Sequence, residues 1–540
     1  MNQRNSRIVD LLILTALVVI VFANVLSNEF VWDDFLYLIN VEAYRTLAFK
    51  NFFLMLGNGN EYLPIRDISY SLDYTFWGEQ PKGFHFTNLA LYLLNIFAVY
   101  FLSEMIVTTI QMKEESAKLL KPATVAFWTA VFFALHPIHC ETVNFIGGGR
   151  NTLLATLFTL LSCRSFFLFL AGNKNSFLTR DVTASFFWYV LAVLSKATAV
   201  SLPLFLLAIC LILKYRPLIT RIAATIPFFF VSGLVYYQYT SIAVNTGIIS
   251  RNASDSLTAA NRIATATQIP FFYLWKFIVP TNLSVDYGSP FSSSLTSPFA
   301  IASIFTIIVF GLSAYAFRIS SPMLYIAFCW YGAFIIPVLH LLPTSVVVAD
   351  RYNFLPSFAF CFLLAYLGVK LGTRWPYLIT TAGIVMCLVL GILSFNQNKV
   401  WKSNLSLWQH TVSVSPRSVQ AMENLGTIYF YMGEYAKALD VLYGIQKMEP
   451  LNPIYDFFEG KYFYELGNLQ RATTSFEHAI EKKSDLIDAL YYLADISEKT
   501  KNFDRAISYY QLLIASKDIE RGPYKKIAKE RLAIICTSVP

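Results

Sequence analysis

The chain has 540 residues and a formal net charge of +8, and 56% of its residues are hydrophobic while only 14% are charged. Soluble globular proteins carry roughly 25% charged residues, so this composition excludes an ordinary soluble enzyme and predicts a polytopic membrane protein. The small positive excess lies mainly in short loops between apolar runs. That pattern is typical of membrane topology and not of a nucleic-acid-binding surface.

Apolar runs of membrane length recur up to residue 395 and predict about eleven spans, because a span needs ~20 predominantly apolar residues. The runs near 184–195 and 197–213 are short and meet at Lys196, which predicts a hairpin that enters the membrane and returns. The aromatic segment 268–280 predicts an interfacial or re-entrant helix. The predicted spans lie near residues 8–27, 86–107, 122–137, 151–171, 184–195, 197–213, 222–240, 298–317, 322–341, 353–372 and 376–395.

The distribution of basic residues predicts which side of the membrane each loop occupies, since inner loops are enriched in Lys and Arg. Arg4 and Arg7 place the N-terminus inside. With eleven spans, the first outer loop, 28–85, and the whole chain after residue 395 then lie on the outer side. The other inner connections are marked by Lys113, Lys118, Lys121, Lys174, Arg180, Lys214, Arg216, Arg221, Arg318, Lys370 and Arg374.

The acidic pair Asp33-Asp34 lies just beyond the first predicted span. Two carboxylates beside a membrane surface are costly to desolvate, which favours a functional role: they can accept a proton, bind a metal or hold a cationic partner. The pair also fits the solvated start of a helix, where Asp is common at the N-cap and in the first turn.

Further polar groups gather in the predicted outer loops and at their edges. A lipid-phosphate donor explains the mixture, because cations must hold the phosphate while a carboxylate deprotonates an incoming hydroxyl. Arg suits a bidentate grip on phosphate, and Lys acts as a point charge. The sequence contains neither GxxxxGK[ST] nor GxGxxG, which excludes these two nucleotide loops. The group comprises Arg66, His85, Asn88, His136, His139, Glu141, Arg150, Lys196, Asp350, Arg351 and Tyr352.

Several of these residues also fit structural roles. His136, His139 and Glu141 predict either a metal site or a capped and packed helix end. Lys196 either holds a phosphate or extends its ammonium from a tight hairpin to the membrane surface. Arg351 either holds a phosphate or pairs with the aspartate that precedes it.

Beyond the last predicted span the chain changes to soluble helical sequence with a 34-residue repeat. Gly426, Gly460 and Ala494 hold one position of this repeat. Small residues at fixed offsets allow paired helices to pack closely and stacked pairs to share a core, which predicts a tetratricopeptide-repeat (TPR) solenoid; a generic helical bundle is the alternative. We therefore divide the chain into a membrane domain, 1–395, and a repeat domain, 396–540.

Seven segments resemble motifs of the TPR-containing transmembrane O-mannosyltransferases and their bacterial relatives. The resemblance covers essentially the whole chain. It implies an all-α fold, in which a polytopic membrane domain of the GT-C glycosyltransferase class precedes the TPR solenoid. The segments are EFVWDD (29–34), GFHFTNLALYLLN (83–95), LHPIHCETV (135–143), GGGRN (147–151), FFYLWKFIVPTNLSVDYGSP (271–290), DRYNFLPS (350–357) and SNLSLWQHTVSVSP (403–416).

The resemblance also implies a reaction: transfer of a sugar from a polyprenyl-phosphate donor to a Ser or Thr hydroxyl of a protein, by single displacement with inversion. The family's acidic pair matches Asp33 and Asp34. We expect Asp33 to be the base and Asp34 to orient the acceptor or the donor sugar. A divalent ion shared between a carboxylate and the lipid phosphate stays open, and no other cofactor is expected. The residues expected to balance the phosphate charge are Lys196, Arg351, Arg150 and Arg66.

The sequence departs from the family's pattern at three places. The usual Glu-Arg-Tyr motif is Asp350-Arg351-Tyr352 here, with an acid that is one carbon shorter. A common Lys-Glu pair appears as Lys196-Ala197, and the missing carboxylate leaves the identity of the sugar open. An Arg-Pro pair after the first-loop tyrosine is replaced by Pro64-Ile65-Arg66.

The expected partners are a lipid-linked sugar donor, the membrane, and protein acceptors presented by the repeats, with no nucleic acid. The expected location is a bacterial inner membrane with a periplasmic active site, or the endoplasmic reticulum membrane with a lumenal one. Two alternatives remain. A glycosyltransferase for a lipid or glycan acceptor would need no protein-binding solenoid, and a non-enzymatic TPR membrane scaffold would need no acidic pair.

Overall fold

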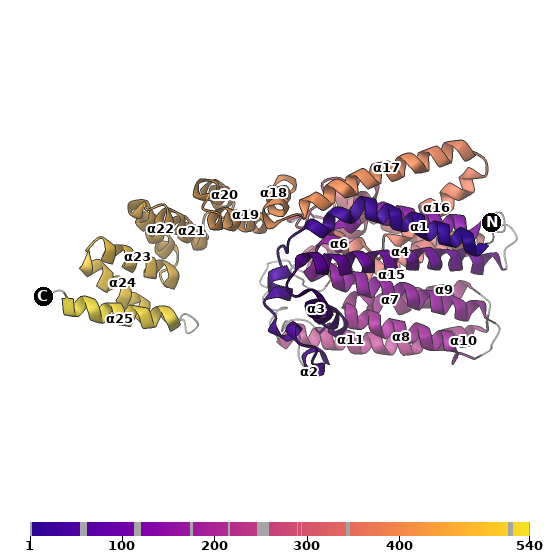
Figure 1. Ribbon diagram of the computed structural model, residues 1–540, viewed down its shortest axis with the longest axis horizontal. Helices are drawn as coiled ribbons and strands as arrows, with labels where there is room; N and C mark the ends of the chain where they lie inside the picture. Colours follow the sequence, from indigo (N-terminus) through magenta and orange to yellow (C-terminus); the bar gives the residue numbers. More distant parts are fainter. Residues whose placement is uncertain are drawn as a thin grey trace. The chain divides into compact units, whose positions relative to one another are not determined.

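The computed structural model of the chain is 81% helical, which confirms the all-α class. No strand occurs among the residues that the structure describes. The chain divides into two compact units, Met1–His410 and Thr411–Pro540. The division falls within α18 (Asn404–Val414), the first helix after the last predicted span (Figure 1). The described residues are 3–53, 62–112, 120–172, 176–213, 216–245, 259–288, 290–292, 294–341, 346–516 and 522–538.

Each of the eleven predicted spans coincides with an apolar helix of the first unit. Among the described residues, six helices are long and apolar enough to cross a membrane, or seven if the bent pair Pro122–Leu135 and Pro137–Asn144 is one span. Membrane-length helices are thus confirmed, and the count of eleven stays a prediction. The helices that coincide with the eleven predicted spans are α1 (Gln3–Phe22), α4 (Pro81–Gln111), α5 (Pro122–Leu135), α7 (Ile146–Ala171), α8 (Arg180–Ser195), α9 (Leu202–Ile212), α11 (Ile226–Asn245), α14 (Pro298–Ser320), α15 (Pro322–Ile335), α16 (Phe358–Gly372) and α17 (Pro376–Val400).

The predicted sidedness also stays a prediction. Four of the basic residues on which it depends, Lys113, Lys118, Lys174 and Lys214, lie outside the described residues.

Proline marks the start of many of these helices. Its missing N–H costs nothing in the first turn, where that donor has no partner within the helix, and its fixed φ suits helical geometry. Five of the apolar helices begin in this way, at Pro81, Pro122, Pro298, Pro322 and Pro376.

Polar side chains tie the apolar helices together. Helix α7 packs against both α4 and α8 (Figure 1). The Asn95 amide of α4 donates to the carbonyl oxygen of Leu153 in α7 across 3.0 Å. Ser162 of α7 donates to the carbonyl oxygen of Ser185 in α8 across 2.7 Å. Between helices in an apolar medium such bonds fix the lateral register of the bundle.

Short elements connect the long helices. The segment predicted at 268–280 belongs to α13 (Ala259–Ile278), which begins earlier because residues 259–267 are helical but too polar for a hydropathy pattern to reveal. The remaining short elements are η1 (Ala23–Ser27), η2 (Phe35–Ile39), η3 (Glu42–Arg45), α2 (Phe49–Phe53), α3 (Pro64–Trp77), η5 (Pro137–His139), α6 (Cys140–Asn144), η6 (Ala197–Ser201), α10 (Leu218–Ala223), η7 (Ile336–Val338) and η8 (Asp350–Asn353).

The described part of the second unit contains three pairs of packed helices, as the 34-residue repeat predicts, followed by one further helix. Gly433 and Gly467 adopt positive φ values of 76° and 75° at the turn within the first two pairs, a conformation that glycine enters without strain. At Gly460 an added Cβ would lie 2.6 Å from the Phe476 ring, so the small residue permits close packing. The helices are α19 (Val419–Tyr431), α20 (Tyr435–Met448), α21 (Pro453–Glu465), α22 (Leu469–Lys482), α23 (Ile487–Lys499), α24 (Phe503–Ala515) and α25 (Gly522–Ser538).

Candidate active site

The carboxylate of Asp34 is buried and joins the first loop to the start of α7. Its Oδ1 accepts a hydrogen bond from the Gly147 N–H across 2.6 Å, and its Oδ2 accepts one from the Val31 N–H across 3.0 Å. Burial raises the pKa of Asp34 to about 7, and these two N–H donors counteract part of that rise. Asp34 precedes η2, but its side chain does not cap that helix. The carboxylate therefore positions the loop.

Asp33, the other member of the pair, is only partly buried, and no described residue is recorded as donating a hydrogen bond to its carboxylate. Burial raises its pKa to about 6, and the nearby Arg351 guanidinium lowers it in part. A carboxylate with this pKa is ionised at neutral pH and remains basic enough to accept a proton. Asp33 thus has the properties expected of a general base.

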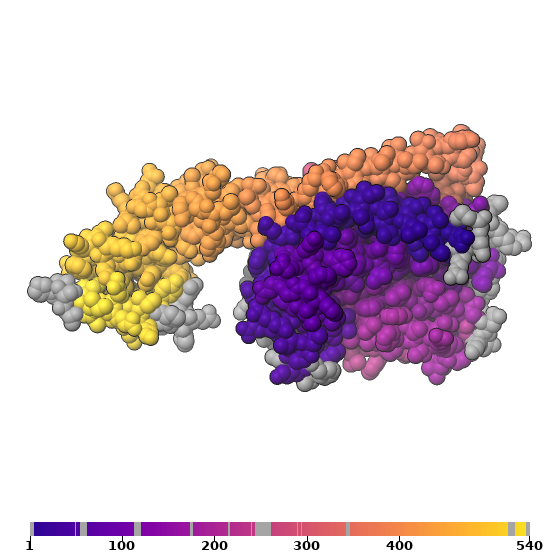
Figure 2. All heavy atoms as spheres, in the orientation of Figure 1, coloured from indigo at the N-terminus to yellow at the C-terminus, as the bar shows by residue number. Residues whose placement is uncertain are grey.

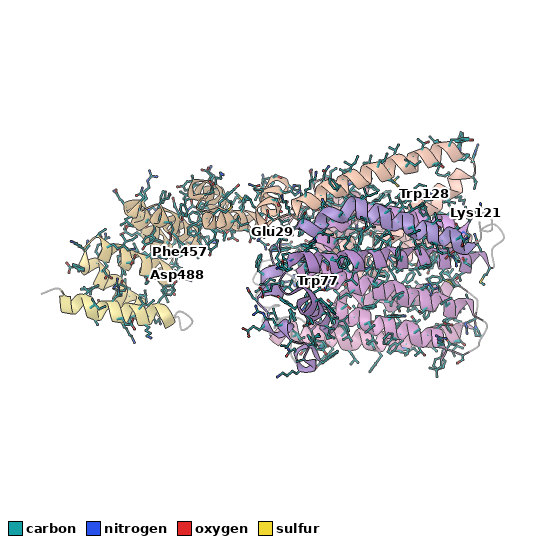
Figure 3. The ribbon with its side chains drawn as sticks, viewed as in Figure 1. Glu29, Trp77, Lys121, Trp128, Phe457 and Asp488 are labelled. Atoms are coloured by element: carbon teal, nitrogen blue, oxygen red, sulfur yellow. The ribbon has the colours of Figure 1, made fainter. Side chains whose placement is uncertain are left out.

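Trp32, the residue before Asp33, has a strained backbone. Its φ is +52°, and a left-handed conformation costs a residue with a side chain roughly 1–2 kcal/mol. Its N–H donates to Asn404 Oδ1 across 2.7 Å, and its ring stacks on Phe145 at 4.9 Å between centroids. The nearby Glu29 N–H donates to the Lys402 carbonyl oxygen across 3.0 Å, so the segment after α17 supports this loop (Figure 3 labels Glu29).

Arg351 lies in η8, where Glu141 of α6 holds it. The guanidinium forms an ion pair with Glu141 Oε1, and the Arg351 N–H donates to Glu141 Oε2 across 2.8 Å. The guanidinium carbon lies 5.9 Å from the Trp32 ring and 5.0 Å from the Tyr352 ring. Arg351 therefore pairs with Glu141 and not with the adjacent Asp350, which accepts a hydrogen bond from the Tyr287 hydroxyl across 2.7 Å.

Lys196 and Arg351 both line one small open cleft. The Lys196 ammonium donates to Thr152 Oγ1 across 2.7 Å and lies 5.4 Å from the Tyr352 ring. Lys196 follows α8 in extended conformation and precedes η6, which places it at the tip of the predicted hairpin. The cleft has polar and apolar walls, formed by Thr152, Ala155, Thr156, Thr159, Lys196, Thr198, Ala199, Phe334, Val338, Arg351, Tyr352, Leu355 and Pro356.

The structure does not bring Arg150 and Arg66 to this cleft. Arg150 is fully buried and pairs with Asp73 across 2.7 Å. Arg66 is also buried and pairs with Asp67 across 2.9 Å. Both arginines pair with aspartates of α3, and neither of them lines the cleft. Their expected part in balancing the phosphate charge therefore has no support at this cleft and stays a prediction.

His136 and His139 are also held by protein groups. His136 Nε2 lies 2.9 Å from the Phe277 carbonyl oxygen, and its Nδ1 accepts the Ile138 N–H at the start of η5. His139 contacts the Phe133 carbonyl oxygen through Nδ1, at 2.7 Å, and the Ser357 hydroxyl through Nε2, at 2.8 Å. With Glu141 bound to Arg351, the three residues do not converge on one point. Within the described residues, no group of three or more His, Cys, Asp or Glu is suited to a metal ion.

His85 and Asn88 lie buried in the first turns of α4. His85 Nε2 is 3.3 Å from the Glu29 carbonyl oxygen. The Asn88 amide donates to the Val143 carbonyl oxygen across 3.0 Å, and its oxygen accepts a bond from the Arg150 guanidinium. His85 therefore links α4 to the first loop, and Asn88 links α4 to α6 and to Arg150.

The run Gly147-Gly148-Gly149 forms the first turn of α7. A Cβ at Gly149 would lie 2.1 Å from the Thr142 carbonyl oxygen, and one at Gly147 would lie 3.2 Å from Asp34 Oδ1. The glycines therefore let α6 and the acidic pair approach the start of α7. Because the Gly147 N–H donates to Asp34 Oδ1, the first turn of α7 holds the acidic pair in place.

Comparisons with known proteins agree with this architecture. A family model described as a tetratricopeptide repeat matches residues 423–487 and 457–523. The chain is 24% identical over 449 residues to the protein O-mannosyl-transferase F38B6.6 of Caenorhabditis elegans, covering 79% of this chain and 60% of that protein. It is 22% identical over 482 residues to the human protein O-mannosyl-transferase TMTC3, covering 82% of this chain and 50% of that protein.

A third relative is the human protein O-mannosyl-transferase TMTC1, 24% identical over 489 residues that cover 77% of this chain and 52% of that protein. The chain thus spans about half to three fifths of the length of these relatives. The matches confirm the resemblance to TPR-containing O-mannosyltransferases over most of the chain.

Proposed function

We propose that this protein transfers a mannosyl residue from a polyprenyl-phosphate donor to Ser or Thr hydroxyls of protein acceptors. The names of the relatives support protein O-mannosylation. The observation that carries the proposal is the placement of Asp33 beside Arg351, which lines a cleft with Lys196. Glycosyl transfer from an anionic lipid needs a base near cations that can hold the phosphate, and here the proposed base lies near one of the two cations that line the cleft.

The cleft suits an amphiphilic anion. Lys196 and Arg351 supply positive charge at one part of its wall, and Phe334, Val338 and Leu355 supply apolar surface. A hydrogen bond to a charged group is worth roughly 1.5–3 kcal/mol, so two cations would bind a phosphate with useful selectivity. The apolar side chains would receive the first isoprene units of the lipid.

The proposed reaction is a single displacement. Asp33 accepts the proton of the acceptor hydroxyl while its oxygen attacks the anomeric carbon from the face opposite the phosphate. The bond between that carbon and the phosphate oxygen breaks, and the polyprenyl phosphate leaves with the electron pair. Lys196 and Arg351 balance its charge. The anomeric configuration inverts, since one displacement occurs.

Glu141 and Asp34 act through other residues in this proposal. Glu141 holds the Arg351 side chain and backbone, and Asp34 fixes the loop that carries Asp33. A divalent ion remains an untested prediction. Asp33 is the carboxylate that would hold it, and a chelator titration during turnover tests the idea.

The repeats would bind the acceptor chain, because TPR solenoids commonly bind other proteins. This role requires the repeats to face the same side as Asp33, either the periplasm of a bacterium or the lumen of the endoplasmic reticulum. Lys437, which is more than half exposed on α20, offers a test. Lys437→Cys should react with an impermeant thiol reagent added from the outer side, and reaction only from the cytoplasmic side would refute this topology.

The decisive experiment uses the full chain in lipid nanodiscs with polyprenyl-phosphate mannose and Ser/Thr-containing protein acceptors. Intact mass should show hexose additions that require the donor and disappear with Asp33→Asn. Products on added lipid or glycan acceptors, with none on protein, would favour the alternative transferase. Absence of donor turnover on every acceptor class would favour a non-enzymatic scaffold.

A further inference from the structure

The polarity of α3 is the inverse of that of a helix on a soluble protein. Its charged residues Arg66, Asp67 and Asp73 are buried. Its outward face carries Leu72, 41% exposed, and Phe76, 74% exposed. A helix between a protein core and water places its apolar stripe inward and its charges outward. The pattern of α3 therefore indicates that its outer face does not meet water.

Specific hydrogen bonds prevent α3 from turning its apolar stripe inward. The Tyr70 hydroxyl donates to the Ile146 carbonyl oxygen across 2.8 Å. Tyr74 donates to the Leu38 carbonyl oxygen across 3.1 Å, and Asp73 pairs with Arg150. These partners lie in η2 and at the start of α7. Rotating the helix would leave buried polar groups unpaired, so the apolar stripe belongs outward.

The outward face of α3 continues onto a membrane-length helix. Trp77, which ends α3, packs against Phe86 in the second turn of α4, with ring centroids 5.9 Å apart. Phe86 is 53% exposed. Figure 3 marks Trp77 at this junction, and in Figure 2 the indigo and purple N-terminal segments form a continuous surface on this face of the unit. Aromatic residues at the end of a span are typical of the boundary between headgroups and acyl chains.

We propose that α3 docks on the bilayer that surrounds α4, with Leu72 and Phe76 inserted at the boundary between headgroups and acyl chains. An interfacial helix buries its apolar face roughly 5–10 Å into this zone. Tyr70 and Asp73 connect the docked helix to the first turn of α7, where Gly147 holds Asp34. The lipid contact therefore sets the depth of the acidic pair relative to the membrane. This inference stands whether or not the proposed transferase activity does.

Spin labels on the full chain in phosphatidylcholine–phosphatidylglycerol nanodiscs test the docking. Oxygen concentrates in lipid and a nickel chelate in water, so their collision rates with a label report its surroundings. A label at Phe76→Cys should collide more with oxygen than with the chelate. The Glu79 side chain is 55% exposed just beyond the helix. A label at Glu79→Cys should collide less with oxygen and more with the chelate than the label at position 76 does. Lys437→Cys on the repeats is the water reference, and labelled parent protein gives the background from native cysteines.

Two results would overturn the proposal. If the label at position 76 collides with the chelate as often as the label at position 437 does, the face of α3 that carries Leu72 and Phe76 is exposed to water. Shielding of position 76 from both reagents would show a protein contact, such as a second copy of the chain. Leu72→Cys supplies a second position on the same face, so a poorly expressed Phe76 variant does not decide the outcome.

Discussion

The N–H of Trp32 donates to Asn404 Oδ1 across 2.7 Å, although the two residues are 372 positions apart. This bond holds the left-handed conformation of Trp32 directly before Asp33. Asn404→Ala would leave a polar group in a strained loop without its partner, at a cost of about 1–3 kcal/mol. We expect kcat to fall roughly 10- to 100-fold with little change in the KM for donor, because each 1.36 kcal/mol corresponds to a factor of ten.

Two variants accompany this prediction. Asn404→Asp keeps an acceptor oxygen and should recover most of the rate. Asn24→Ala removes a different bond, from the Asn24 amide to the Phe395 carbonyl oxygen at 3.2 Å, and should leave kcat near the parent value. Equal losses in Asn404→Ala and Asn24→Ala would mean that Asn404 contributes only to general stability.

The two aspartates should respond differently to amide substitution. Within the described residues the Asp33 carboxylate accepts no hydrogen bond, so Asp33→Asn removes only the proposed base, and activity should fall ~10²–10⁴-fold with an unchanged melting temperature. In Asp34→Asn an amide NH2 would face a backbone N–H, because Val31 and Gly147 each donate to one carboxylate oxygen. That variant should also melt at a lower temperature. Near-normal transfer by both variants would disprove the proposed mechanism.

The rate should depend on pH through Asp33. Below its pKa, raised to about 6, the carboxyl group is protonated and cannot accept a proton, so kcat/KM should rise with pH through that value; protonation of Asp34, whose pKa is raised to about 7, adds to the loss on the acid side. Arg351 lowers this pKa, and Arg351→Gln should therefore move the acid limb to higher pH. Lys196→Gln should weaken donor use without moving the limb. If the acid-side fall in kcat/KM occurs at the same pH in Arg351→Gln as in the parent protein, a group other than Asp33 is responsible for it.

The sequence predicts the helices and the repeats well because both depend on local periodicity. It also predicts that Lys196 and Arg351 lie at one end of the membrane unit, because each is next to a helix terminus on the same predicted side. The partners of Arg150 and Arg66 depend on tertiary packing. Their aspartates on α3 were visible in the sequence, but no local rule indicated that these charges would pair in the interior.

Asn404 escaped prediction for a similar reason. It is uncharged and bonds to a residue in the first loop, 372 positions away, which no local pattern of the sequence indicates. The low helix propensity of glycine favours a loop at residues 147–149. Their helical position follows from the close approach of Thr142, which a propensity cannot show.

Two equivalent glycines of the repeats should tolerate a methyl group differently. At Gly460 the Cβ would lie 2.6 Å from the Phe476 ring, whereas at Gly426 the nearest atom would be 3.6 Å away. Gly460→Ala should destabilise its helix pair by about 1–3 kcal/mol through overpacking. Gly426→Ala should be neutral or stabilising by about 0.5–1 kcal/mol, because Ala suits a helix interior better. Hydrogen exchange in the full chain measures the difference, at α21 and α22 for Gly460→Ala and at α19 and α20 for Gly426→Ala, and an equal change in protection in both variants would contradict it.

Deletion of residues 416–540 separates the roles of the two units. The proposed donor-binding and catalytic groups, Asp33, Lys196 and Arg351, all belong to the unit Met1–His410, and the deletion keeps α18 through Val414. Donor binding and transfer to a short peptide at high concentration should therefore largely survive. Transfer to protein acceptors should fall, because the repeats would no longer raise the local concentration of the acceptor chain. Quantitative mass spectrometry of both acceptor types measures the ratio. Full modification of protein acceptors by the shortened chain would assign the repeats a role in assembly or regulation instead.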